Sequence, residues 1–248
     1  MKKMEFSIRK FSQIDSTNEE ALRLIADRRA KEGIVLQADS QTRGRGAGQN
    51  NWESEPGKNL TFSVILEPHF LEPSKQFVLT EMISLALFDV VERRLGNEGL
   101  FIKWPNDLWF HDKKLAGVLV QNRVKGNQLE YSVVGVGLNV NQKNFYSDAP
   151  NPGSMIHFSG KKENLSRLLD EILIQFSVYY QKIIQNEKSL ENSYLQRLFQ
   201  MGKWADYSDA AGRFTAQITG INQYGQLILT DRQGKQRVYG FKEIEFLT

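Results

Sequence analysis

The sequence predicts an α+β domain followed by a small module built of strands. Between residues 165 and 183, apolar side chains recur at helical spacing, which predicts the clearest amphipathic helix of the chain. Beyond Trp204 the pattern changes to short β-branched and aromatic segments separated by turn residues, at 215–221, 227–230 and 236–239. We therefore expect a first domain over residues 1–204 and a second, barrel-like domain over residues 205–248.

The first domain is expected to mix helices and strands. A helix is predicted at 18–30, because Ser16 and Glu19 have the spacing of a capping box and apolar residues follow them. Further elements are predicted along the first half of the chain: strands at 34–38, 60–66 and 101–104, and a largely buried helix at 77–95.

Two longer strands are predicted next, at 114–121 and 129–139, joined by a hairpin turn at 125–127. Residues 144–162 carry Pro, Gly, Ser and Asn and are expected to form a loop. A second, shorter helix is predicted at 190–199, after the amphipathic one. No internal repeat interrupts this order.

The composition excludes several classes of function. The chain has no Cys and only 3 His, so we expect neither disulfides nor a tightly bound transition metal. The formal net charge is +3, with both signs interspersed, which is not the footprint of a nucleic-acid partner. No apolar stretch approaches the roughly 18 residues of a membrane span, and no signal peptide is visible. We therefore expect a cytoplasmic protein with no membrane partner.

A glycine- and arginine-rich segment, QTRGRGAG at 41–48, begins a stretch without periodicity that continues to residue 58. Glycines permit close backbone approach, so successive N–H groups can point at one anion. Arg43 and Arg45 add cationic forks that match phosphate or carboxylate oxygens. The segment is neither a P-loop nor a dinucleotide fingerprint. It fits a site where a carboxylate meets a triphosphate, although a surface loop with solvated arginines has the same composition.

Five motifs follow one another in a particular order. They are STN at 16–18, QTRGRG at 41–46 with Trp52, KWPND at 103–107, KLAG at 114–117 and GVGLN at 135–139. In this order they resemble the motifs of biotin–protein ligases over about residues 15–140, with weaker similarity toward the C-terminus. KWPND followed shortly by KLAG is the most specific part of the resemblance.

The resemblance implies a class II synthetase-like mixed β-sheet with flanking helices, and a small SH3-like C-terminal barrel. It implies an enzyme that activates biotin with ATP and Mg²⁺ to biotinyl-5'-AMP. The biotinyl group would then pass to a lysine on the biotin-carrier domain of a carboxylase. Repressor-type members carry an N-terminal helix-turn-helix, for which there is no room before residue 6, so we expect none. A homodimer through an edge strand stays open.

The resemblance also implies residue roles, position by position. Lys114 would lie between the biotin carboxylate and the α-phosphate, with Arg45 and Asp107 as further catalytic candidates and Asp107 beside the metal. Trp52 would help cover the ligand. The implied contacts to biotin, the adenylate or the nucleotide are Ser16, Thr17, Asn18, Gln41, Gly44, Arg45, Gly46, Trp52, Lys103, Asn106, Lys114, Gly117, Gly135 and Asn139.

Simpler interpretations exist for several of these residues. Ser16 can act only as a helix cap. Lys114 and Asp107 both lie near expected turns, where exposed polar residues are common. Gly135 and Gly137 can mark bulges in a strand rather than close approach of a ligand.

The sequence departs from the family's usual loop pattern, GRGRxGRxW, at two positions. Ala47 and Asn50 stand where further arginines are usual. We expect this difference to affect how tightly the adenylate is held more than whether it forms. Ala47→Arg is therefore expected to slow escape of the adenylate.

Two alternatives remain beside the biotin ligase. A lipoate ligase or octanoyltransferase shares the fold, but it would need a longer apolar tunnel and a different motif in place of QTRGR. A nucleic-acid-binding module would use the arginine-rich segment and the small barrel, and the mild net charge disfavours it.

Overall fold

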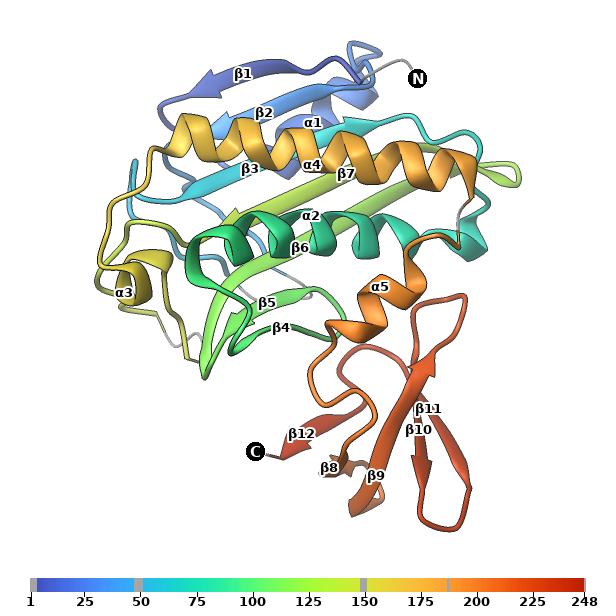
Figure 1. Cartoon of the computed structure of the whole chain (residues 1–248). Helices are drawn as coiled ribbons and strands as arrows, with labels where there is room; N and C mark the ends of the chain where they lie inside the picture. Colours follow the sequence, from blue (N-terminus) through green and yellow to red (C-terminus); the bar gives the residue numbers. More distant parts are fainter. Residues whose placement is uncertain (1–3, 47–50, 148–150, 187, 248) are drawn as a thin grey trace.

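The computed structural model describes residues 4–46, 51–147, 151–186 and 188–247. Within these ranges the first domain is built on a mixed sheet with the strand order β1-β2-β3-β7-β6-β5-β4 (Figure 1). Its strands are β1 Ser7–Phe11, β2 Ile34–Ala38, β3 Leu60–Leu66, β4 Leu100–Lys103, β5 Asp107–Phe110, β6 Lys113–Lys125 and β7 Gln128–Leu138. Only β1 and β2 pair in parallel, and every other neighbouring pair runs antiparallel.

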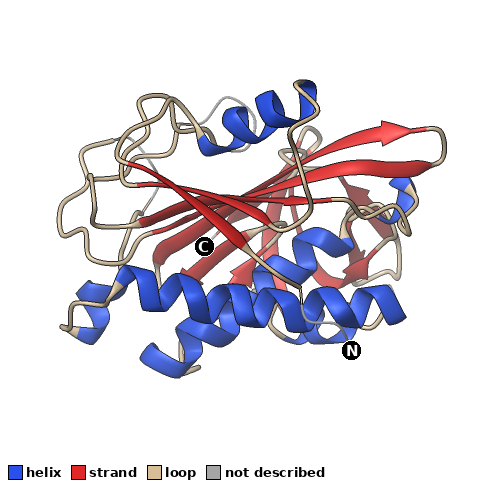
Figure 2. Cartoon of the chain, turned by 90° about the horizontal axis from the view of Figure 1, so that it is seen from above, coloured by secondary structure: helices blue, strands red, loops and turns tan. Residues whose placement is uncertain are grey.

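Helices cover both faces of this sheet, as Figure 2 shows from above. The helices are α1 Thr17–Ala26, α2 Val78–Leu95, α3 Met155–Ser159, α4 Leu165–Gln185 and α5 Glu191–Gln196. Alternate residues of a strand point to opposite faces, so Leu36 and Ile65 pack against α1 while Val35 and Val64 join the larger core around α2 and α4. None of the helices in the described ranges is both long and apolar enough to span a bilayer.

A second, antiparallel sheet follows α5, with the order β11-β10-β9-β8-β12. Its strands are β8 Trp204–Asp209, β9 Gly212–Ile221, β10 Leu227–Asp231, β11 Gln236–Tyr239 and β12 Glu245–Leu247. The buried Trp104 donates a hydrogen bond from its indole N–H to the Gly225 carbonyl, at 2.9 Å, and so ties the two sheets together. The α+β fold with a small C-terminal β unit is confirmed, whereas the boundary at 204/205 and the SH3-like character stay predictions.

The helix at the STN motif is shorter than predicted, and its cap differs. α1 ends at Ala26. Ser16 has the extended backbone of an N-cap, but within the described chain its side chain makes no capping hydrogen bond. Glu19, the expected partner in the capping box, pairs with Arg45 instead, with 2.6 Å between Oε1 and Nη1. The capping-box prediction was therefore wrong, because a tertiary ion pair takes the carboxylate that the local motif needs.

Other differences concern short elements. The loop predicted at 144–162 contains α3, which begins at a capping box of Ser154 and His157. The helix predicted at 190–199 is confined to α5, since the chain after it pairs with Ile102 through backbone hydrogen bonds. The strands β1, β5, β8 and β12 were not predicted. All four are short, and β1, at the edge of its sheet, is exposed over most of its length.

Candidate active site

A cavity of about 820 Å³ lies between α1, the glycine- and arginine-rich loop, the middle strands of the first sheet and the end of the chain. The predicted site residues that line it are Ser16, Thr17, Asn18, Gln41, Arg45, Gly46, Trp52, Lys103, Asn106, Asp107, Lys114, Gly117, Gly135 and Asn139. Gly44 is not among the described residues that line it. The motifs that are scattered in sequence therefore meet at one place.

One end of the cavity is polar and neutral. The backbone N–H of Thr17 donates to Gln41 Oε1 at 2.7 Å, and the Thr17 hydroxyl lies 3.1 Å from the same oxygen. Behind them, the fully buried Ser63 hydroxyl lies 2.7 Å from Thr17 Oγ1 and 2.6 Å from Asn18 Oδ1. Buried polar groups that hold one another in this way present fixed donors and acceptors to a ligand.

Ser63 was missed by the sequence analysis, together with Gln121, which accepts a hydrogen bond from Asn18 Nδ2 at 2.8 Å. A serine within the otherwise apolar segment 62–66 was the available signal, because a buried hydroxyl needs a partner. Asn18 also explains a glycine: a Cβ at Gly135 would lie 2.1 Å from Asn18 Oδ1. The glycine lets α1 approach the strand closely, so bulging is not its reason.

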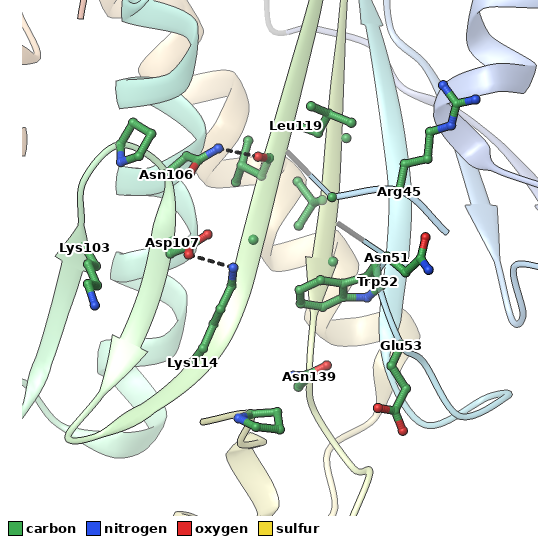
Figure 3. Close-up of a pocket in the computed structure, with 18 of the residues that line it drawn as sticks. Arg45, Asn51, Trp52, Glu53, Lys103, Asn106, Asp107, Lys114, Leu119 and Asn139 are labelled. Carbon is green, nitrogen blue, oxygen red and sulfur yellow. Dashed lines mark hydrogen bonds and ion pairs between the residues drawn. The ribbon is translucent and has the colours of Figure 1, made fainter. Parts of the chain in front are cut away.

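Trp52 lies against two further glycines in the centre of the cavity (Figure 3). A Cβ at Gly137 would lie 2.2 Å from the indole ring, and a Cβ at Gly117 would lie 3.3 Å from it. Gly117, which was expected beside the ligand, lines the cavity and lies next to the indole. Gly44 holds the backbone of Trp52: its carbonyl accepts the Trp52 backbone N–H at 3.0 Å, and a Cβ at Gly44 would lie 2.7 Å from the Trp52 carbonyl oxygen.

The opposite side of the cavity is charged. Lys114 Nζ lies 2.6 Å from Asp107 Oδ2, and both side chains are about three-quarters covered (Figure 3). Lys103 Nζ lies 4.6 Å from the centre of the Trp109 ring and 5.5 Å from that of Phe246. Burial raises the pKa of Asp107, and the positive charge of Lys114 partly offsets this rise. Burial lowers the pKa of Lys103. Two amines beside one carboxylate suit an anionic ligand.

Arg45 does not meet Lys114 in this structure. Its guanidinium pairs with Glu19 and is about 60% exposed, and Figure 3 shows its side chain directed away from Lys114 and Asp107. Arg45 and Lys114 line the same cavity, and that both cations flank one ligand stays a prediction. In this conformation the carboxylate within reach of Arg45 is that of Glu19, in the first turn of α1. Ala47 and Asn50 lie outside the described residues.

The cavity also uses residues that no motif indicated. Its walls include Glu53, Thr61, Phe145, Ser147 and, from the last part of the chain, residues 241–242 and 244–246. Among the described residues, no group of three or more His, Asp or Glu side chains could hold a metal ion.

The chain is similar in sequence and in structure to known protein ligases. The sequence profile of the biotin/lipoate A/B protein ligase family matches residues 11–139. The "Bifunctional ligase/repressor BirA" of Bacillus spizizenii is 28% identical over 239 residues, covering 92% of this chain and 71% of that protein. The "Biotin--[acetyl-CoA-carboxylase] ligase" of Paracoccus denitrificans is 26% identical, covering 91% and 95%. Among solved structures, the biotin protein ligase of Aquifex aeolicus in complex with biotin and ATP matches with a TM-score of 0.79 and 24% identity, covering 96% and 97%.

Proposed function

We propose a biotin ligase activity from one premise: the chain belongs to the biotin/lipoate A/B protein ligase family. In this proposal the chain activates biotin with ATP to biotinyl-5'-AMP and transfers the biotinyl group to a lysine on the biotin-carrier domain of a carboxylase. The observation that carries the proposal is a single cavity with a neutral hydrogen-bonding end and a charged side formed by Lys114 and Asp107. We propose that the enzyme acts in the cytosol.

The neutral end suits the ureido ring of biotin, which has two N–H donors and one carbonyl acceptor. Thr17 Oγ1 can accept from a ring N–H group, and the hydroxyl of Ser16, which lines the same cavity, can donate to the carbonyl. Gln41 Oε1 already accepts from the backbone N–H and the hydroxyl of Thr17 and so holds Thr17 in place. The chain of hydrogen bonds behind Thr17 fixes its orientation before biotin arrives. Preorganised polar groups of this kind favour a ligand that pairs with all of them.

In the first step, a biotin carboxylate oxygen attacks the α-phosphorus of ATP, the new P–O bond forms and pyrophosphate leaves. Two anions must approach each other, so charge neutralisation and positioning dominate the catalysis. Lys114 is proposed to lie between the carboxylate and the α-phosphate, with Lys103 toward the leaving phosphates. Arg45 must leave Glu19 to contribute, and this exposed pair is worth only about 0–1 kcal/mol.

Mg²⁺ is proposed to bind together with ATP rather than to occupy a site formed by the protein alone. Asp107 supplies one carboxylate, and the Asn106 amide beside it donates its N–H to the Val118 carbonyl at 2.6 Å, which leaves the Asn106 oxygen facing away from that bond. Bound Mg²⁺ typically keeps phosphate and water oxygens as most of its ligands. It would supply charge neutralisation of the leaving pyrophosphate.

In the second step, the neutral amine of a carrier lysine attacks the acyl carbon of the adenylate, an amide bond forms and AMP leaves. The amine must lose a proton, and Asp107 is the carboxylate proposed to accept it. Burial raises the pKa of Asp107, which makes this carboxylate a stronger base than an exposed one. The ion pair between Asp107 and Lys114 joins the lysine proposed for the first step to the carboxylate proposed for the second.

The test is an assay of pyrophosphate release by the purified chain with ATP and Mg²⁺, supplied with biotin or with lipoate. Biotin-dependent release, with the mass of biotinyl-5'-AMP recovered from the protein, is the expected result. Release with lipoate alone would assign the lipoate branch of the family instead. Release with neither acid would remove the proposal.

A further inference from the structure

The carboxylate of Glu53 joins two segments that lie far apart in the sequence. Glu53 Oε1 accepts the backbone N–H of Tyr146 at 2.9 Å, and Glu53 Oε2 accepts the backbone N–H of Ser147 at 2.8 Å. The side-chain amide of Gln142 adds a longer contact at 3.4 Å. Burial alone would raise the pKa of Glu53, but the hydrogen bonds from Ser147 and Tyr146 hold it below its ordinary value. The carboxylate is therefore ionised when it holds these N–H groups.

Both joined segments form walls of the candidate active site. Glu53 follows Trp52 directly, and both residues line the cavity. Phe145 and Ser147 line it from the other segment. Residues 142–146 form neither helix nor strand, and Tyr146 is 86% exposed. The start of this wall is anchored separately, because the buried Gln142 side chain accepts the Glu55 N–H and the Asn59 amide. At residues 146–147 the link to the Trp52 segment is the pair of hydrogen bonds to Glu53.

The position of this wall along β7 indicates which part of a ligand it meets. Gly135, Gly137 and Asn139 follow one another at every second position, and a strand rises about 3.3 Å per residue, so Asn139 lies roughly 13 Å from Gly135. Gly135 lies at the neutral end proposed for the ureido ring. Asn139 Oδ1 is buried without a hydrogen-bond partner among the described residues. It can accept a hydrogen bond from a ribose hydroxyl or a purine amine. The aromatic ring of Phe145 lines the same cavity.

We propose that Glu53 is a positioning residue for the nucleotide, holding residues 145–147 against the Trp52 segment so that the adenosine half of the substrate meets a formed wall. The inference rests on the proposed ligase function. It assigns Glu53 no contact with a reacting atom. Its effect is on the affinity for ATP and on retention of the adenylate, because a wall that is ordered in advance lowers the entropy cost of binding.

The test compares Glu53→Ala and Glu53→Gln with Glu55→Ala as the matched control. Glu55 is exposed and has the same charge, and it lies outside the lining of the cavity. Loss of hydrogen bonds to a carboxylate is expected to raise the KM for ATP on the order of ten-fold in Glu53→Ala, with the KM for biotin unchanged. Glu53→Gln keeps only one accepting oxygen and should give an intermediate KM for ATP. Release of the adenylate should quicken in the same order.

A merely structural role would lower the melting temperature, or raise both KM values together, and either result without the split between ATP and biotin overturns the proposal. Equal KM values for ATP in Glu53→Ala and Glu55→Ala overturn it as well. Amide hydrogen exchange on the ligand-free chain separates this inference from the proposed function. Faster exchange at Tyr146 and Ser147 in Glu53→Ala than in Glu55→Ala supports the link whether or not biotin is the substrate, and equal exchange removes it.

Discussion

Gly137→Ala tests the arrangement of the indole in the centre of the cavity. The new Cβ would lie 2.2 Å from Trp52 Cε2 and 2.6 Å from Cζ2 and Nε1. These distances are far inside van der Waals contact, so either the β7 backbone or the indole must move. β7 is hydrogen-bonded to β3 and β6 on both sides. The indole borders an open cavity, so it is the part that we expect to move, into the space that the ligand needs.

The size of the effect follows from the cost of overpacking. Added methyl groups in packed sites cost about 1–3 kcal/mol, and a ligand that must push the indole back bears that cost. A loss of this size corresponds to a fall of roughly five- to 150-fold in kcat/KM for adenylation. Gly117→Ala, with 3.3 Å to the same ring, should lose less. Gly220→Ala is the neutral control, because no described atom lies within 4 Å of its Cβ position.

The assay is biotin-dependent pyrophosphate release at varied ATP and biotin, with thermal unfolding measured alongside. The expected order of activity loss is Gly137→Ala, then Gly117→Ala, then Gly220→Ala, with melting temperatures close to that of the wild type. Wild-type kcat/KM in Gly137→Ala would refute the reasoning, because the indole could not then lie where the structure has it. A large fall in melting temperature would show that the strand yields instead.

Three further predictions address the charges. Lys114→Ala should lower biotin-dependent pyrophosphate release by about 10²–10³-fold with the fold intact by circular dichroism; near-normal release would contradict its role. Ala47→Arg should slow release of the adenylate in a filter-binding chase, and equal release would contradict it. Burial, with Glu191 nearby, raises the pKa of Glu81 from 4.5 to about 8. The folded chain then keeps a proton that the unfolded chain loses, so stability falls as pH rises through this window. Glu81→Gln should remove a fall of roughly 4 kcal/mol in urea unfolding between pH 5 and 8, and parallel pH curves would contradict this.

Much of the candidate site could be predicted because each motif holds several of its residues on one element. KLAG and GVGLN lie on neighbouring strands, and their pairing in register sets Gly117 opposite Gly137. The register itself could not be read from the sequence, because it depends on the hairpin turn and on which faces are buried. The cover of Gly117 by Trp52 therefore appeared only in the structure.

The site residues that were not predicted were missed for a different reason. Phe246 reaches Lys103 across more than half of the chain, and no local pattern records such a contact. For Arg45, the residue type predicted an anionic partner, but the sequence did not show in which direction the side chain points. A guanidinium on a glycine-rich loop can turn to Glu19 or to a ligand at little difference in free energy. The composition of such a loop indicates which ligands it can bind. The position of the Arg45 guanidinium depends on which carboxylate or ligand lies near it in the folded chain.

The neutral end of the cavity bears most directly on the choice between biotin and lipoate. A dithiolane ring offers no N–H group and no carbonyl, so lipoate would give no hydrogen bond to the remaining acceptor site of the Thr17 hydroxyl or to the Ser16 hydroxyl, which both line this end of the cavity. An unpaired buried polar group costs about 1–3 kcal/mol. Two such groups cost about 2–6 kcal/mol, which offsets the gain of about 0.8 kcal/mol for each methylene of the ring that is buried against the Gly135 strand. Because Ser63 holds the Thr17 hydroxyl in place from behind, Thr17 has no alternative orientation that would relieve the cost. Selectivity for biotin would then come from the penalty on its rival as much as from its own hydrogen bonds.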